Sequence, residues 1–286
     1  MIVPAATSQG VAAALAEETG ARLGDVEYRR FPDGELLVEV PEQAGRAVVV
    51  GSTLTSDAHI QLLQLQDAVR EAGAAEIVTV IPYMGYARQD TSFATGQPIS
   101  ARAMARAIST GTDRVITVNP HETAVCEFFS VPADAVDAAG RLATPLPDDL
   151  SSPIFLAPDE GALSIATTVR DAYGTGETDY FEKRRDRETG DIEIQPSEVA
   201  VGDRDVVIVD DIVATGSTMS EAIEILQGRD PARVFVVTVH PLLVENARTK
   251  LETAGVEGIY GTDTVERAVS AVSVAPAIAR YLEGPV

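Results

Sequence analysis

The sequence has very little lysine and cysteine. Lys183 and Lys250 are its only lysines, and the other basic residues are arginines. A single cysteine, Cys126, excludes a disulfide framework and a zinc site built on cysteines. The first ten residues, MIVPAATSQG, lack the basic region and the long apolar run of a secretory leader. No segment approaches the apolar length of a membrane span, so we expect a cytoplasmic protein without a membrane partner.

Basic charge as a whole is also scarce. Asp and Glu total 44 against 22 Lys plus Arg, which gives a net charge of −22. This excess disfavours nucleic acids and anionic membranes as partners, because both repel an acidic surface. The acids are spread along the chain rather than gathered in a tail. An ordinary acidic cytosolic protein and a halophilic protein both fit, and the near absence of lysine favours the halophilic interpretation.

Short Val- and Ile-rich runs between helical patterns are abundant. Examples are AVVVGS, AAEIVTVIPY, DRVITVNP, SPIFLAPD, DVVIVDD and ARVFVVTVHP. Continuous apolar runs that alternate with amphipathic helices are typical of parallel strands covered on both faces. The sequence therefore predicts an α/β fold of mainly parallel sheets flanked by helices.

Two segments of the chain look alike. Residues 48–83 and 206–241 each run from a strand through a turn with Gly, Ser and Thr and then a helix to a Val-rich strand followed by a proline. The likeness predicts two related domains. Chance similarity between two strand–helix–strand units is the alternative explanation.

The stretch VVIVDDIVATGST, residues 206–218, joins an apolar strand to a loop suited to phosphate. The loop residues are Thr215, Gly216, Ser217 and Thr218. Their N–H groups and hydroxyls precede a helix, whose positive end favours an anion. We expect that helix to begin at about Thr218, with Glu221 completing a capping box.

Two carboxylates, Asp210 and Asp211, precede this loop. No Gly-Lys-Ser/Thr occurs, and no strand-to-helix turn has Gly-x-Gly-x-x-Gly, so a Walker loop and a Rossmann fingerprint are excluded. Carboxylates beside a phosphate loop suit a sugar phosphate, because they accept hydrogen bonds from vicinal hydroxyls. A structural role for Asp211 as the cap of a turn would explain one acid, but not the Asp-Asp pair together with the loop that follows it.

A strand that is followed by Asp-Asp-x-x-x-Thr-Gly-x-Thr resembles the ribose-phosphate loop of the type I phosphoribosyltransferase fold. Further segments narrow the resemblance to the ribose-phosphate diphosphokinases, or PRPP synthetases. They are RFPDGE (30–35), YMGYARQD (83–90), VNPHETAVCEFF (118–129), FLAPDEGAL (155–163) and YFEKRRDRETGDIEI (180–194). The resemblance covers essentially the full chain and implies two domains of that fold.

By this resemblance, residues of the first two segments bind ATP. Phe31 would stack on the adenine, and Asp33 and Glu35 would bond to its polar edge. Arg88 and Gln89 would also contact the nucleotide, and the planar fork of arginine suits that role. In the family the loop of Phe31 serves a neighbouring subunit, which implies a homo-oligomer with an active site at the subunit interface. Read alone, the segments are a Pro-Asp-Gly turn and a solvated loop.

The resemblance also implies Mg²⁺ as the cofactor, near His121 and Asp159. His121 matches a family histidine that helps to hold the Mg-ATP phosphates, and Asp159 an aspartate of the Mg²⁺ and ribose network. Read alone, a histidine is usually structural, and Asp159 also suits a helix N-terminus. Asn119 departs from the commoner aspartate, although its amide oxygen can still face the water shell of the ion.

Lys183 and Arg185 lie in the segment 180–194, called the basic segment after its cluster KRRDR at 183–187, and the segment predicts a long hairpin. The charge of that cluster opposes the charge of the chain, and the cluster contains one of the two lysines, which argues against a merely solvated tip. In the family this loop closes over the β- and γ-phosphates of ATP. Its cations would neutralise the charge that develops in the transition state.

The resemblance implies transfer of the β,γ-diphosphoryl group of ATP to the anomeric hydroxyl of ribose 5-phosphate, giving PRPP and AMP. Asp210, Asp211 and the 215–218 loop would bind ribose 5-phosphate. One alternative is a phosphoribosyltransferase that uses PRPP, which would leave FPDGE and YARQD without a role. The other is a non-catalytic regulator, which would be expected to lack His121, Asp159 or the lysine loop.

The expected domain boundary lies near ATPLPDDLSS, where prolines and acids cluster. We expect an ATP-side domain over 1–145, with the C-terminal segment, about 272–286, packing back on it. We expect the ribose-5-phosphate-binding domain over 146–271.

Overall fold

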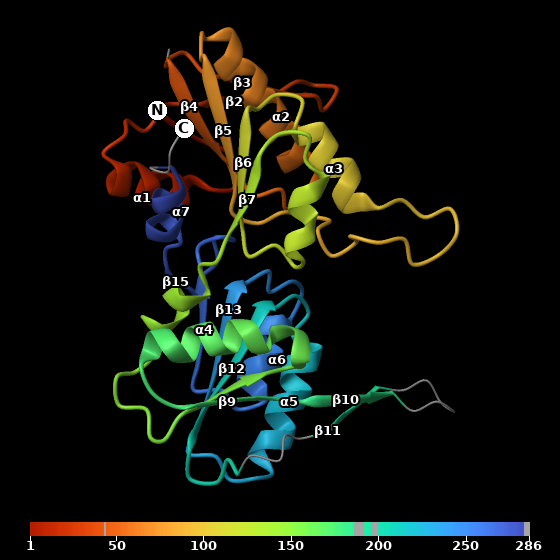
Figure 1. The fold of residues 1–286 in the computed structure, drawn as a ribbon, viewed down its shortest axis with the longest axis vertical. Helices are drawn as coiled ribbons and strands as arrows, with labels where there is room; N and C mark the ends of the chain where they lie inside the picture. Colours follow the sequence, from red (N-terminus) through yellow and green to blue (C-terminus); the bar gives the residue numbers. More distant parts are fainter. Residues whose placement is uncertain (43, 186–191, 196–199, 283–286) are drawn as a thin grey trace. The chain divides into compact units, whose positions relative to one another are not determined.

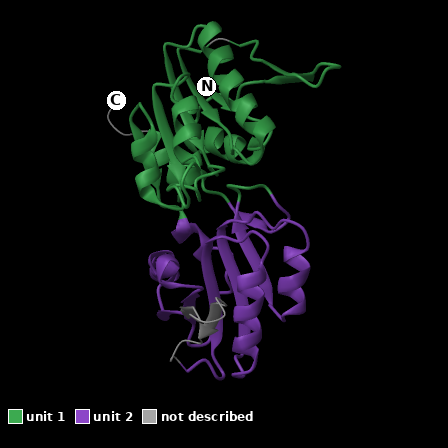
Figure 2. Ribbon diagram, turned by 90° about the vertical axis from the view of Figure 1, so that its right-hand side faces the viewer, with its two compact units in different colours: residues 1–138, 263–266, 273–286 green, residues 139–262, 267–272 purple. Residues whose placement is uncertain are grey.

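The computed structural model describes residues 1–42, 44–185, 192–195 and 200–282 (Figure 1). The chain forms two compact units (Figure 2). The first contains residues 1–138, 263–266 and the C-terminal part from residue 273, and the second contains 139–262 and 267–272. The substrate that each half binds stays a prediction.

The first unit is built on a five-stranded parallel sheet in the order β1-β4-β5-β6-β7. The strands are β1 Ile2–Pro4, β4 Arg46–Val50, β5 Glu76–Ile81, β6 Arg114–Val118 and β7 Ala133–Val136. The helices are α1 Gln9–Thr19, α2 Ser56–Glu71, α3 Ser100–Ile108, the 3₁₀ helix η1 Thr123–Phe128 and the C-terminal α7 Ala275–Leu282. An antiparallel hairpin, β2 Glu27–Arg30 and β3 Leu36–Glu39, forms a second sheet. Helix α7 packs against α1, so both chain ends contribute to this unit (Figure 1).

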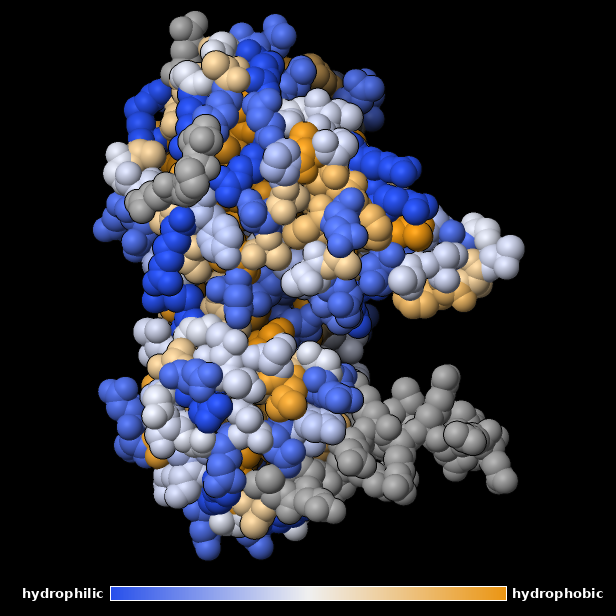
Figure 3. Space-filling view, viewed as in Figure 1, coloured by the Kyte–Doolittle hydropathy of each residue, from blue (hydrophilic) through white to orange (hydrophobic). Residues whose placement is uncertain are grey.

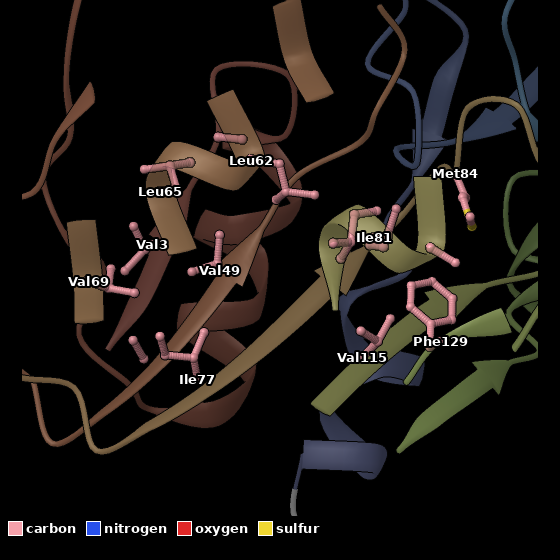
Figure 4. Close-up of a cluster of buried hydrophobic side chains, with 14 of the residues drawn as sticks. Val3, Val49, Leu62, Leu65, Val69, Ile77, Ile81, Met84, Val115 and Phe129 are labelled. Atoms are coloured by element: carbon pink, nitrogen blue, oxygen red, sulfur yellow. The ribbon is translucent and has the colours of Figure 1, made fainter. Parts of the chain in front are cut away.

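The core of the first unit lies between this sheet and its helices. Val3, Val49 and Ile77 come from three neighbouring strands and are fully buried. They belong to the same cluster as Leu65 and Val69 of α2 (Figure 4). Burying each such side chain contributes about 1.5–3 kcal/mol. The apolar residues of the strands therefore stabilise the sheet, and the carboxyl ends of its strands lead into the polar loops described below.

The second unit is built on a six-stranded parallel sheet in the order β15-β14-β13-β12-β8-β9. The strands are β8 Ile154–Ala157, β9 Glu177–Tyr180, β12 Asp205–Ile212, β13 Arg233–His240, β14 Gly258–Thr262 and β15 Ser270–Val272. The helices are η2 Ala139–Ala143, η3 Glu160–Ala162, α4 Leu163–Tyr173, α5 Ser217–Gln227 and α6 Ala247–Thr253. The predicted α/β class is confirmed.

The predicted hairpin in the basic segment is also present. Strands β10 Glu182–Arg185 and β11 Ile192–Gln195 pair antiparallel. Residues 186–191, which join them, lie outside the described residues.

The two units repeat one order of elements. Strands β1-β4-β5-β6-β7 of the first sheet correspond to β8-β12-β13-β14-β15 of the second. In both, a hairpin lies in the sequence between the first two strands of this series, β2–β3 in one unit and β10–β11 in the other. Because the correspondence extends over all five strands of the first sheet, with only β9 of the second left over, chance likeness of one segment does not explain it. The prediction of two related domains is confirmed.

Among the described residues, no helix combines the length and the apolarity needed to cross a membrane. Strongly hydrophilic residues are scattered over the visible face of each unit (Figure 3).

His59 of α2 is a buried histidine whose ring nitrogens have no hydrogen-bond partner in the described part of the chain. His59 is 8% exposed, and burial lowers the pKa of its imidazole ring below 6.5. The unfolded chain therefore binds a proton that the folded chain does not bind, once the pH falls below 6.5. As the pH is lowered below 6.5, we expect the free energy of unfolding to decrease by up to about 1.4 kcal/mol per pH unit. The decrease ends when the pH reaches the pKa of His59 in the folded protein.

The measurement is the free energy of unfolding in denaturant between about pH 7.5 and about pH 5.5, where histidine titrates and most other groups do not. A His59→Leu variant should show a smaller loss of stability over this interval than the parent. Equal losses in the two proteins would show that His59 is not the group responsible.

Candidate functional site

Asp210 and Asp211 lie within β12, because that strand continues to Ile212. Thr238 of the adjacent β13 donates its hydroxyl to the backbone oxygen of Asp211 at 3.2 Å. Strand β8, on the other side of β12, ends at Ala157, and Asp159 follows it. Since parallel strands end at one edge of the sheet, the three aspartates come together at the carboxyl edge of the second unit, where open α/β sheets bind ligands.

These aspartates influence one another electrostatically. Burial raises the pKa of the Asp210 carboxyl well above its usual range, and the charges of Asp211 and Asp159 raise it further. The backbone N–H of Asp211 donates a hydrogen bond to Asp210 Oδ1 at 2.9 Å, and this bond lowers the pKa of Asp210. A bound cation or a set of hydroxyl donors would relieve this repulsion. The cluster is therefore suited to a polyhydroxylated ligand and to a divalent cation.

Asp159 also has a structural role. Its Oδ1 accepts a hydrogen bond from the backbone N–H of Ala162 at 3.3 Å, so it caps the 3₁₀ helix η3. The expected position of this acid at a helix N-terminus is confirmed, and its role toward a ligand stays a prediction.

No group of three or more His, Cys, Asp or Glu side chains within the described ranges is arranged to hold a metal ion by itself. Mg²⁺ in proteins usually keeps several waters and takes one or two carboxylates together with phosphates of a substrate. The oxygen donors at this sheet edge fit that pattern.

The phosphate loop follows β12 and leads into α5. Gly216 has a left-handed backbone with φ 70° and is the N-cap, so α5 begins at Ser217. The predicted capping box with Thr218 and Glu221 is wrong, because Thr218 already lies in the first turn and no side chain caps the helix. Thr215, Ser217 and Thr218 are exposed. The loop thus presents hydroxyls and the N–H groups of a helix start at the protein surface, an arrangement suited to an anion.

The corresponding turn in the first unit is filled by its own chain. Ser52 and Thr53 are only 1% and 2% exposed. The Ser52 hydroxyl donates to the backbone oxygen of Thr264 at 2.6 Å and accepts from the Tyr83 N–H at 3.0 Å. The Gly85 N–H donates to Thr53 Oγ1 at 2.9 Å. Of the two related turns, the one in the second unit is therefore the one open to a ligand.

The segment FPDGE forms the tip of the β2–β3 hairpin. Asp33 Oδ1 accepts the N–H of Glu35 at 3.1 Å, and Gly34 has a φ of 95°, so the segment is the turn that Pro-Asp-Gly predicts. Phe31 is 45% exposed, and Asp33 and Glu35 are exposed beside it. An aromatic ring and two carboxylates thus lie together at an exposed tip, and their contact with adenine stays a prediction.

Arg88 and Gln89 follow β5 in the first unit. Arg88 is exposed. Gln89 Nε2 donates to the backbone oxygen of Pro98 at 3.1 Å, and its Oε1 accepts from the Ser100 hydroxyl at 2.7 Å. Gln89 therefore ties the middle of the loop between β5 and α3 to the start of α3. Binding of ATP by either residue stays a prediction.

The structure gives a physical reason for asparagine at position 119. Asn119, just after β6, donates its Nδ2 to Asp137 Oδ1 at 2.9 Å and accepts the N–H of Ala138 at 2.8 Å. Its amide therefore ties together the ends of β6 and β7. An aspartate here would lose the donor and place a second negative charge against Asp137. His121, two residues further on, is exposed beyond the same strand end.

Lys183 and Arg185 lie in β10, of which only the backbone is described. Lys183 is opposite Ile194 and Arg185 opposite Ile192, whereas Arg184 is opposite Glu193. Because alternate positions of a strand share a face, residues 183 and 185 belong to one face of the hairpin and residue 184 to the other.

Lys250 is a residue of this site to which the sequence pattern assigned no role. Its Nζ donates to Ser217 Oγ at 3.2 Å and to the backbone oxygen of Thr215 at 3.4 Å. The signal available in the sequence was the scarcity of lysine, since Lys250 is one of only two.

Two family models match most of this chain. Residues 1–111 match the family model of the N-terminal domain of ribose phosphate pyrophosphokinase, and residues 134–276 match that of the phosphoribosyl transferase domain. The chain is 65% identical over 284 residues to a ribose-phosphate pyrophosphokinase of Halobacterium salinarum, covering 99% of this chain and 100% of that protein. It is 42% identical over 287 residues to one from Methanosarcina mazei, covering 99% and 95%.

Among solved structures, the phosphoribosylpyrophosphate synthetase from Mycobacterium smegmatis has a similar fold. The TM-score is 0.83 at 23% identity, over 99% of this chain and 97% of that one.

Proposed function

The chain belongs to the ribose-phosphate pyrophosphokinase family, and we propose that it carries out the reaction of that family on ATP and ribose 5-phosphate. The anomeric hydroxyl of ribose 5-phosphate attacks the β-phosphorus of ATP, and the bond from that phosphorus to the α,β-bridging oxygen breaks. PRPP forms, AMP leaves and a proton is released. The observation that carries this proposal is the exposed phosphate loop beside three aspartates in a chain that is 65% identical to a full-length relative of that name.

Ribose 5-phosphate binds to the second unit in this proposal. The backbone N–H groups and hydroxyls of Thr215, Gly216, Ser217 and Thr218 bind its phosphate. Asp210 and Asp211 accept hydrogen bonds from its ribose hydroxyls. The separation between an open loop and a carboxylate cluster supports this division of roles, because the two ends of the ligand differ in charge.

ATP is bound by residues of the first unit. Phe31 stacks on adenine, Asp33 and Glu35 accept hydrogen bonds at its polar edge, and Arg88 and Gln89 contact the nucleotide. The exposed tip of the β2–β3 hairpin supports a role toward a neighbouring subunit, because a tip that projects its aromatic ring can reach another chain. We therefore propose a homo-oligomer, a dimer or larger, whose active site lies at the subunit interface.

Mg²⁺ is the proposed cofactor, with His121 and Asp159 as the residues that help to hold it. When bound, the ion neutralises charge on the phosphate oxygens of ATP. Lys183 and Arg185 add positive charge where it develops on the leaving oxygen, and exclusion of water makes this more effective. Positioning of the two substrates contributes most of the remaining rate enhancement.

The product of the reaction tests this proposal. We expect AMP and PRPP when the protein is incubated with ATP, Mg²⁺ and ribose 5-phosphate at high KCl. Release of ADP would indicate ordinary phosphoryl transfer instead, and the absence of any product would favour a non-catalytic regulator. A phosphoribosyltransferase would consume added PRPP when a nucleobase is supplied.

We further propose that the enzyme works in a cytoplasm rich in salt. The net charge of −22 and the similarity to a protein of Halobacterium salinarum support this setting. Activity should rise as KCl is increased into the molar range, because salt screens the repulsion between acidic side chains. A steady decline with KCl would contradict it.

A further inference from the structure

The second lysine of the chain lies directly against the phosphate loop. Lys250 belongs to α6, and its Nζ is 3.2 Å from Ser217 Oγ and 3.4 Å from the backbone oxygen of Thr215. Gly216, between these two residues, packs against the start of α6, since a Cβ there would lie 3.3 Å from the backbone oxygen of Ala247. Helix α6 is therefore seated on the loop and carries the ammonium group to it.

We propose that Lys250 binds the phosphate group of ribose 5-phosphate and supplies the cation of that subsite. This inference rests on the proposed function, because it takes the 215–218 loop to be the phosphate site. A phosphate oxygen that accepts a hydrogen bond from Ser217 Oγ would lie about 2.7 Å from it. The ammonium already bonds the same hydroxyl and has three donors, so it can exchange the Thr215 oxygen for the phosphate.

The charges of the site give the reason why a cation is needed. The loop itself contributes only neutral donors, and Asp159, Asp210 and Asp211 lie at the same sheet edge. A phosphate monoester brings a further charge of about −1.5 to −2 at neutral pH. A lysine in contact with the loop offsets part of this repulsion. Its compact charge and flexible stem suit a ligand that must enter and leave.

The other cation of the helix does not have this position. Arg248 Nε pairs with Glu252 Oε1 at 2.8 Å on the surface of α6, and its side chain is 56% exposed. Lysine near the C-terminus of a helix often interacts with the last carbonyls of that helix. The two Lys250 contacts are instead made outside α6, with the loop that precedes α5.

The test is direct binding of ribose 5-phosphate, measured by calorimetry without ATP. We expect Lys250→Met and Lys250→Gln each to weaken binding about tenfold, which is the size of a charge-assisted hydrogen bond in a partly exposed site. In steady-state assays the KM for ribose 5-phosphate should rise to a similar degree, and the KM for ATP should stay within about twofold. Lys250→Arg, which keeps the charge, should recover part of the loss.

Arg248→Met is the matched control, because it removes one positive charge from the same helix away from the loop. We expect it to leave the affinity for ribose 5-phosphate unchanged. Equal affinities for Lys250→Met and Arg248→Met would overturn the proposal. So would a Lys250→Met protein that unfolds at a lower temperature but binds normally, since Lys250 would then only brace the loop. Calorimetry requires no turnover, so this result is independent of whether the protein makes PRPP.

Discussion

Replacing Lys183 by alanine is expected to lower turnover by about 10²–10³-fold and to leave the binding of ribose 5-phosphate nearly unchanged. In the proposed reaction this lysine neutralises charge that appears on the leaving oxygen only in the transition state. In the same proposal ribose 5-phosphate binds elsewhere in the second unit, at the loop between β12 and α5. The measurements are kcat by AMP release and the dissociation constant of ribose 5-phosphate by calorimetry.

Arg184→Ala is the matched control for this variant. Arg184 is the intervening residue of β10, and it is opposite Glu193 on the other face of the hairpin. We expect turnover of the Arg184→Ala enzyme to remain within about threefold of the parent, because position 184 does not share the face of positions 183 and 185. A Lys183→Ala enzyme with normal turnover would refute the assignment of this hairpin to the reaction.

Gly85→Ala is expected to destabilise the first unit by about 3 kcal/mol or more, since overpacking a rigid site forces backbone shifts. A Cβ on Gly85 would overlap the backbone oxygen of Thr53, which no side-chain rotation can relieve. The same glycine donates its N–H to Thr53 Oγ1 at 2.9 Å, so a shift of the loop would also break a buried hydrogen bond. Arg88 and Gln89 lie in the same loop, so the proposed binding of ATP should weaken as well.

Gly45→Ala provides the control, because a Cβ at that position meets nothing within 4 Å. Its effect on the free energy of unfolding should stay within about 0.5 kcal/mol. Denaturant unfolding of both variants gives the comparison, and calorimetry with ribose 5-phosphate shows whether the second unit remains intact in Gly85→Ala. Equal stabilities of the two variants would show that the 83–86 turn is not held against Thr53.

The sequence was informative wherever local pattern decides the structure. The apolar runs at 206–209 and 234–237 form neighbouring buried strands, as their composition requires. The basic segment around Lys183 forms a hairpin, and FPDGE forms a turn. These features depend on residues close together in the chain, so periodicity and turn chemistry were sufficient to predict them.

Three features of the candidate functional residues in the two units depend on contacts or conformations that the pattern did not reveal. The left-handed Gly216 starts α5 at Ser217, so Thr218 is not its cap. Asn119 bonds to Asp137 and Ala138, which follow another strand. Lys250 reaches a loop more than thirty residues before it in the chain, because α6 packs on Gly216. Sequence motifs contain no information on such distances.

The sequence by itself determined the class of fold, the duplication and the family to which the chain belongs, because strand composition and short motifs are local properties. Only the tertiary structure decided which of the two related turns is open. Ser52 and Thr53 are buried, and their hydroxyls form hydrogen bonds with segments distant in the chain. Ser217 and Thr218 remain at the surface. The tertiary structure also brought Lys250 to the open turn. Both outcomes follow from the packing of segments far apart in the chain, since such packing decides whether a polar group is satisfied within the protein or is left for a ligand.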